Sequence, residues 1–156
     1  MKKLDVAIIS SLRQNGRLRL TQLSKKIKEP VSTLHERLNI NIRQEIVKPT
    51  VLLDFDKIGF RSRAFILLAA EEKDKLVEYL GKHPNVNMLA KINNGWSLIM
   101  EGVFRDMQAL EDFVDNLESR FHIKQKQVHY VIAELKRESF VSKPDVADLI
   151  LCPSGK

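Results

Sequence analysis

Nine side chains between positions 17 and 37 have the types and spacing needed to bind a hydrogen-bonding polyanion. Four are cations placed around a short apolar repeat: Arg17, Lys25, Lys26 and Lys28. Five polar or charged side chains follow Pro30: Ser32, Thr33, His35, Glu36 and Arg37. Cationic side chains neutralise phosphates and position a nucleic acid, whereas an arginine can donate two hydrogen bonds to a guanine in the major groove. The pattern therefore predicts backbone contacts from the first group and base contacts, above all from Arg37, in the second.

Arg37 also allows a second interpretation. Its guanidinium could contact a phosphate, or it could pair with Glu36 or Glu29 and hold the local structure together. Some of the lysines would then be no more than solvated surface cations.

The charge distribution favours a polyanionic partner for the first third of the chain. Residues 1–48 hold eleven Lys and Arg against four Asp and Glu, a net +7, whereas residues 49–156 hold fifteen against sixteen, a net -1. The whole positive excess of this 156-residue chain therefore lies before position 49. Net charge informs on partners rather than on fold, so the pattern of apolar residues must supply the fold.

Three short helices are predicted to position these side chains. Their apolar stripes are Leu4, Ile8, Ile9 and Leu12, then Leu20, Leu23 and Ile27, then Val31, Leu34, Leu38 and Ile42. Asn15-Gly16 suits the end of the first helix, and Pro30 suits the first turn of the third. Only a few residues around Lys28 and Glu29 separate the second helix from the third, which is the length of the turn in a helix-turn-helix.

After position 47 the apolar period changes to that of strands. We interpret residues 1–47 as a helix-turn-helix domain, 48–60 as a linker strand, 61–136 as a ferredoxin-like domain, and 137–156 as a C-terminal tail. In the third segment, strands at 61–70, 86–92, 96–104 and 124–134 alternate with helices at 74–81 and 106–120. The fold class is therefore α+β, with a ferredoxin-like βαββαβ domain behind the helices.

No pattern in the chain predicts catalysis, a cofactor or a metal site. The four histidines, His35, His83, His122 and His129, lack metal-ligand spacing, and Cys152 is the single cysteine. No phosphate loop or nucleophile motif is present. Without these motifs we expect a protein that is not an enzyme. No stretch has the length of a membrane span, so we also expect a soluble, cytoplasmic protein that does not bind membranes.

The order and spacing of several motifs resemble the Lrp/AsnC, or feast/famine, family of prokaryotic transcription regulators over nearly the whole chain. The motifs are Leu4-Asp5 with Ile8 and Leu12, Asn15-Gly16-Arg17, Leu23-Ser24-Lys25-Lys26-Ile27, Ser32-Thr33-Leu34-His35-Glu36-Arg37-Leu38 and His83-Pro84-Asn85-Val86. The resemblance implies a helix-turn-helix that binds double-stranded DNA. It also implies a C-terminal domain that forms homodimers through its sheet, assembles further into tetramers or octamers, and binds a small amino-acid effector between dimers.

Three departures from the family pattern affect these expectations. Lys28-Glu29 stand where a glycine is usual in the turn before the recognition helix, so this turn must form without positive φ or under strain. Glu45 replaces the glycine usual after that helix and Asn41 occupies a usually apolar position, so we expect a remodelled helix end. The effector loop reads Asn94, Gly95, Trp96 and Ser97, and lacks the usual acidic residue.

We therefore expect a sequence-specific transcription regulator with a dimer interface on an apolar sheet face, with Leu98, Met100 or Val131 as candidates. Two alternatives remain: a tetrapyrrole decarboxylase related to this family, and a DNA-compacting assembly protein of low specificity. The decarboxylase would have no need of the basic N-terminal third.

Overall fold

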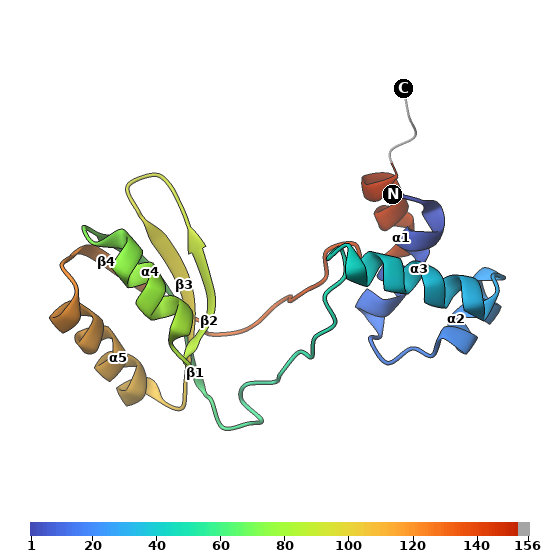
Figure 1. Cartoon of the computed structure of the whole chain (residues 1–156). Helices are drawn as coiled ribbons and strands as arrows, with labels where there is room; N and C mark the ends of the chain where they lie inside the picture. The colour runs from blue at the N-terminus through green and yellow to red at the C-terminus, as the bar shows by residue number, and fades with distance from the viewer. Residues whose placement is uncertain (153–156) are drawn as a thin grey trace. The chain divides into compact units, whose positions relative to one another are not determined.

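The computed structural model describes residues 1–152, which fold into two compact units (Figure 1). The helical unit comprises residues 1–51 together with the described residues from 135 onward. The sheet unit comprises residues 52–134. The helical unit is thus built from both ends of the chain, and the sheet unit is inserted between them in the sequence.

Four helices form the helical unit. They are α1 (Lys3–Gln14), α2 (Leu20–Ile27), α3 (Val31–Arg43) and α6 (Pro144–Leu151). The first three confirm the helices expected from the apolar spacing. Their shared core centres on the fully buried side chains of Ile8, Leu23 and Leu34, one from each helix. Val31 is an exception to the expected stripe, because this first residue of α3 is 39% exposed.

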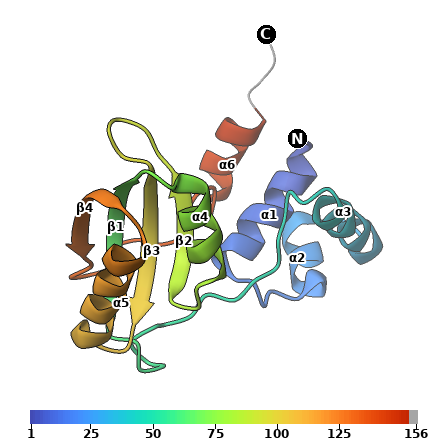
Figure 2. The same cartoon turned by 60° about the vertical axis from the view of Figure 1, so that its left-hand side comes forward.

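The segment after position 137 differs from the expected tail. Residues Pro144–Leu151 form α6, which packs on α1 (Figure 2). Proline is favoured in the first turn of a helix because its missing N–H has no partner there, and its φ is already helical. Ala147 of α6 is fully buried, which ties the end of the chain to its beginning.

The expected linker strand at 48–60 is wrong. No residue from 48 to 60 is in a strand, and residues 55–59 form consecutive turns in which the Phe60 N–H donates to the Phe55 carbonyl at 2.9 Å. Val51 and Leu52 are 77% and 59% exposed. A strand needs a neighbouring strand to pair with its backbone groups, and β-branched residues alone do not supply one.

The sheet unit has the expected βαββαβ order. Its elements are β1 (Ser62–Ala70), α4 (Lys73–Lys82), β2 (Val86–Lys91), β3 (Leu98–Phe104), α5 (Met107–Arg120) and β4 (Ile123–Tyr130). The four strands form one antiparallel sheet in the order β2-β3-β1-β4. Both helices cover the same face of the sheet (Figure 2), as in a ferredoxin-like fold.

Alternation along the strands gives the sheet one covered and one open face. Ile66 on β1 and its partner Met100 on β3 are fully buried beneath the helices, and Leu98 is 1% exposed there. Successive side chains of a strand point to opposite faces, so Phe65, Leu67 and Ile99 lie on the open face and are only half-buried. Leu98 and Met100 are therefore core residues, and the expectation that they cover an open face is wrong.

No helix within residues 1–152 is long and apolar enough to cross a membrane.

Candidate nucleic-acid interface

The turn between α2 and α3 is short and held by local hydrogen bonds. Lys28 ends α2 with φ 58° and ψ 41°, the left-handed conformation, and Pro30 precedes the first turn of α3. The Ser24 hydroxyl donates to the carbonyl of Glu29 at 2.6 Å. The turn expected from the sequence is present, and Lys28 adopts the positive φ that glycine would adopt without strain.

The side chains expected to contact DNA are mostly free to do so. Seven of the nine are exposed: Arg17, Lys25, Lys26, Lys28, Ser32, His35 and Glu36. Thr33 is half-buried. On α3, Ser32, His35, Glu36 and Asn39 recur at the three- and four-residue spacing of one helix face, and Asn39 contacts the His35 ring nitrogen at 3.3 Å. That face is polar and open to solvent.

Arg37 lies apart from this face and is held inside the helical unit. Its Nε donates to Asp5 Oδ1 at 2.8 Å, and its second nitrogen pairs with Asp5 Oδ2. The Arg37 side chain is 22% exposed and that of Asp5 only 3%. The partner is neither Glu36 nor Glu29 but an acid on α1, because Arg37 borders the stripe that packs α3 onto that helix.

Asn41 completes a buried polar cluster with Asp5 and Arg37. Its amide nitrogen donates to Asp5 Oδ1 at 3.1 Å and to the Arg37 carbonyl at 2.9 Å, and the residue is 2% exposed. Burial raises the pKa of Asp5, but hydrogen bonds from Arg37 and Asn41, with the Arg37 charge, outweigh it and hold that pKa below its usual value. The polar residue at a usually apolar position therefore satisfies a buried carboxylate.

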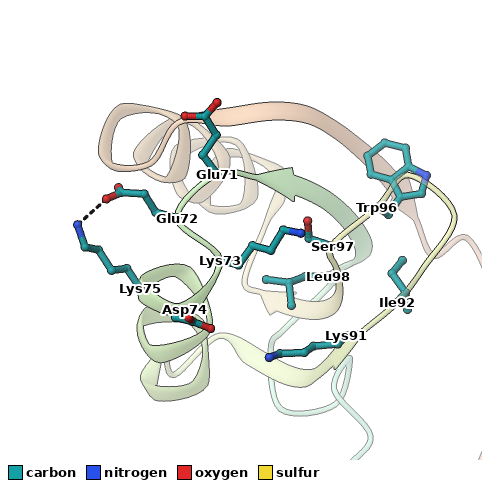
Figure 3. A pocket seen from close by; sticks show the side chains of 10 residues that line it. All are labelled: Glu71, Glu72, Lys73, Asp74, Lys75, Lys91, Ile92, Trp96, Ser97 and Leu98. Carbon is teal, nitrogen blue, oxygen red and sulfur yellow. Dashed lines mark hydrogen bonds and ion pairs between the residues drawn. The ribbon is translucent and has the colours of Figure 1, made fainter.

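A second candidate site is a recess of about 570 Å³ in the sheet unit, between the start of α4 and the loop joining β2 to β3 (Figure 3). Its lining combines charged residues with an apolar wall: Glu71, Glu72, Lys73, Asp74, Lys75, Lys91, Ile92, Trp96, Ser97 and Leu98. Trp96 and Ser97 thus line a hollow, as an effector role requires. Asn94 and Gly95 do not line it; they form the tight turn, with φ 64° and 90°.

The charges of this recess are only partly neutralised. Glu71 pairs with Lys124 at 3.0 Å, which lowers the pKa of Glu71, and Glu72 pairs with Lys75 at 2.5 Å. In the part of the chain that the structure describes, Lys73, Lys91 and Asp74 form no ion pair. Two ammonium groups and one carboxylate that line the recess therefore have no ion-pair partner among the described residues.

The model of the Lrp/AsnC ligand binding domain matches residues 63–141, about half of the chain. An HTH-type transcriptional regulator of Pyrococcus abyssi is 32% identical over 117 residues, which cover 73% of this chain and 74% of the relative. The chain belongs to the Lrp/AsnC family. A second regulator, from Pyrococcus horikoshii, is 29% identical over the same length.

Solved structures of Lrp/AsnC regulators share the fold. A Neisseria meningitidis transcriptional regulator in complex with L-Met has a TM-score of 0.81 at 24% identity, covering 88% of this chain and 93% of that one. LrpC of Bacillus subtilis has a TM-score of 0.78 at 22% identity, covering 87% and 97%. These relatives are transcriptional regulators and not enzymes, in agreement with the expectation of a non-enzyme.

The two glycine positions that this Lrp/AsnC protein lacks are both strained. Lys28 has φ 58° and Glu45 has φ 56°, so each backbone keeps the left-handed conformation without the residue that adopts it freely. The carbonyl of Asn41 accepts hydrogen bonds from the N–H groups of Ile46 and Val47, which fixes the chain after α3. The strain expected in the turn before α3 is present at Lys28. After α3, Glu45 adopts the left-handed conformation and these hydrogen bonds close the helix end.

The candidates chosen from the sequence do not include the two residues that bind Arg37, Asp5 and Asn41, or the three charged residues of the recess that form no ion pair with any described residue, Lys73, Asp74 and Lys91. Asp5 carries a usable signal, since an acid that falls on the apolar side of α1 beside Leu12 needs a buried partner. Asn41 gives the same signal on α3. Lys73, Asp74 and Lys91 carry no such signal, because charges near strand and helix ends are ordinary surface features.

Proposed function

We propose that this chain is a sequence-specific DNA-binding transcription regulator that acts in the cytoplasm on double-stranded DNA. The observation that carries the proposal is the polar side of α3, which faces solvent. The helix α3 directly follows the exposed lysines of α2 and of the turn. A helix-turn-helix of this kind places its second helix in the major groove, with the N-terminal residues nearest the bases.

The exposed residues divide into two roles. Lys25, Lys26 and Lys28, with Arg17, contact phosphates and set the orientation of the helices. Ser32, Thr33, His35 and Glu36 lie in the first two turns of α3 and reach the base edges. Because Arg37 is bonded to Asp5, we assign it to the positioning of α3 instead of to base reading.

Selection of bound sequences from a random DNA pool tests this function directly. Enrichment of one motif, followed by tighter binding to that motif than to random DNA, is the expected result. Lys25→Ala should weaken binding to both DNAs about equally and reduce the slope of log affinity against log salt by roughly one unit. Lys82→Ala makes the same charge change on the sheet unit and should alter neither quantity.

Two outcomes would contradict the proposal in different ways. Binding without enrichment of any motif would favour the alternative of a low-specificity, DNA-compacting protein. Absence of binding to any DNA at low salt would remove the DNA-binding function altogether.

We also propose that the chain assembles through the open sheet face, first as a homodimer and then as a tetramer or octamer. Phe65, Leu67 and Ile99 are half-buried on this face in the single chain, and a second copy would remove the remaining apolar surface from water. Light scattering should give at least twice the chain mass of 18.0 kDa. A mass of one chain that persists at micromolar concentration would contradict this.

The recess of the sheet unit is the proposed effector site, and its free charges favour a zwitterion. Lys73 and Lys91 would hold a carboxylate, Asp74 would accept from an ammonium, and Trp96 with Ile92 would contact an apolar side chain. This is the charge pattern of a free amino acid. Asp74 also offers a carboxylate at a site whose loop has Ser97 instead of an acid.

A further inference from the structure

The helix α1 has two buried sides, and only one of them belongs to the helix-turn-helix core. Ile8, with Leu4 and Leu12 one turn away on either side, faces α2 and α3. Val6 and Ser10 are 1% and 0% exposed, although neither belongs to that core. At 3.6 residues per turn they lie on the far side of the helix from Ile8. A second element must cover that far side.

The C-terminal segment covers it. Arg13, which is on the same side of α1 as Val6, donates from Nε to the Phe140 carbonyl at 3.2 Å and pairs with Glu138 at 3.0 Å. In the next helix of the segment, α6, Ala147 is fully buried, and the Cys152 thiol donates to the carbonyl of Met1 at 2.8 Å. The helix α6 packs on α1 (Figure 2), and a small side chain on each helix, Ser10 on α1 and Ala147 on α6, is fully buried.

The covered side of α1 is connected through the helix to the recognition helix α3. Asp5 on α1 holds Arg37 and Asn41 of α3, so a displacement of α1 moves the side chains that orient α3. The matched family domain ends at residue 141, before α6 begins at Pro144. The sequence of α6 therefore lies outside the part of the chain that the family model describes.

We infer that the segment from 137 to 152 is a positioning element of DNA binding: docked α6 holds α1, and α1 holds α3, in the arrangement that binds DNA. This inference rests on the proposed DNA-binding function. One consequence is that the sheet unit is joined to the helical unit at both of its ends, before residue 52 and after residue 134. Ligand-driven changes in the sheet unit then have two covalent routes to the helices.

The test uses two substitutions on α6 of the full chain. Ala147→Glu places a charge at a fully buried position and should release α6, because an unpaired charge is costly to bury. Leu149→Glu makes the same charge change at a position that is 78% exposed and serves as the matched control. If one molecule in ten keeps α6 docked, affinity for the selected DNA falls about tenfold. Leu149→Glu should bind like the parent chain.

The single cysteine reports whether α6 is docked. Alkylation of Cys152 by iodoacetamide, a small neutral reagent, should be slow in the parent chain and in Leu149→Glu, and fast in Ala147→Glu. Linkage is reciprocal, so the selected DNA should slow alkylation of the parent chain more than random DNA does. If α6 stabilises the fold without positioning α3, the alkylation rate of Cys152 should be the same with the selected DNA as with random DNA.

Each outcome bears on the inference. Fast alkylation of Ala147→Glu with parental DNA affinity would overturn it. If Ala147→Glu does not fold, Arg13→Ala takes its place in the test, because it removes the contacts with Glu138 and Phe140 at the surface. Ala147→Ser is the control and should retain both docking and affinity. Failure of the parent chain to bind any DNA would refute the proposed function instead, and the alkylation rates would still decide whether α6 is docked.

Discussion

Arg37 on α3 and Asp5 on α1 are joined by two hydrogen bonds across 32 positions of sequence. Asn41 adds a third hydrogen bond to the same carboxylate. Because both oxygens of a buried acid are used, the rotation of α3 about its own axis is fixed relative to α1. That rotation decides which side of α3, and hence which of its exposed residues, faces a groove of DNA.

The first prediction separates positioning by Arg37 from base reading. Asp5→Ala leaves the Arg37 guanidinium without its carboxylate acceptor and removes one of the two acceptors of the Asn41 amide, so it should destabilise the helical unit by about 1–3 kcal/mol. Arg37→Ala should also destabilise it, and the double variant should cost less than the two single changes together, because the residues act as a pair. Hydrogen exchange of the α1 and α3 amides measures these changes.

DNA affinity provides the decisive comparison. If Arg37 only positions α3, the two single variants should weaken binding to the selected sequence by similar factors. A much larger loss for Arg37→Ala than for Asp5→Ala, confined to the selected sequence, would show that Arg37 does contact a base edge.

A second prediction concerns acid pH. The pKa of Asp5 is lower in the folded chain than its unfolded value of 3.8, so the stability that Asp5 contributes is fully present above that value. It is lost as the pH falls through the folded pKa, because the unfolded chain takes up the proton first. The difference in stability between the parent chain and Asp5→Asn should therefore shrink as the pH falls below about 4. A difference that stays constant from pH 6 to about pH 2 would show that Asp5 does not titrate in this way.

Local patterns predict the helices and the sheet, since the apolar periods that define α1, α2, α3 and the βαββαβ unit are properties of neighbouring residues. The partner of Arg37 is different in kind. Glu36 and Glu29 are closer in sequence, and only the packing of α1 against α3 brings Asp5 nearer. Leu98 and Met100 show a related limit, because alternation divides a strand into two faces without saying which face the helices cover.

The sequence pattern cannot predict the conformation of the linker or the packing of α6. Residues 48–60 have strand-forming side chains, but a strand also needs a partner strand, which the pattern cannot name. The eight residues of α6 start with Pro144 and contain an apolar side that is compatible with a helix. Nothing in those residues indicates that the helix packs on α1, at the other end of the chain.

A third prediction uses the positive φ of Lys28 to separate backbone strain from charge. Lys28→Gly and Lys28→Ala both remove the ammonium group, but only glycine adopts φ 58° without a steric cost. The left-handed conformation costs an L-residue roughly 1–2 kcal/mol, and a glycine at position 28 removes this cost. The flexibility of glycine in the unfolded chain offsets part of the gain in stability. Lys28→Gly should therefore be more stable than Lys28→Ala by about 1 kcal/mol in thermal or urea unfolding.

Their DNA binding should nevertheless change together. Loss of one phosphate contact reduces the salt slope by roughly one unit in both variants. Equal stability of the two variants would mean that the backbone at position 28 relaxes. A salt slope equal to that of the parent chain would mean that Lys28 does not touch DNA.

The last prediction tests the recess of the sheet unit with its own fluorophore. Trp96 is the single tryptophan of the chain and lines the recess, so a ligand that enters should change the intrinsic fluorescence. A panel of free amino acids should contain at least one that alters this signal and protects the sheet unit against unfolding, by about 2.7 kcal/mol at a hundred times its dissociation constant.

Lys73→Ala and Lys91→Ala should each weaken binding roughly tenfold or more, because each removes a charged hydrogen bond to the ligand carboxylate. Asp74→Asn should weaken the binding of amino acids more than the binding of the corresponding carboxylic acids that lack the amine, because it removes the carboxylate acceptor for the ammonium group. Lys82→Ala, on the same helix as Lys73 but paired with Glu78 at 2.7 Å and outside the recess, should change nothing. If no amino acid alters the fluorescence or the stability, the recess is not an amino-acid site. Binding that Asp74→Asn leaves unchanged would exclude recognition of the amine by this carboxylate.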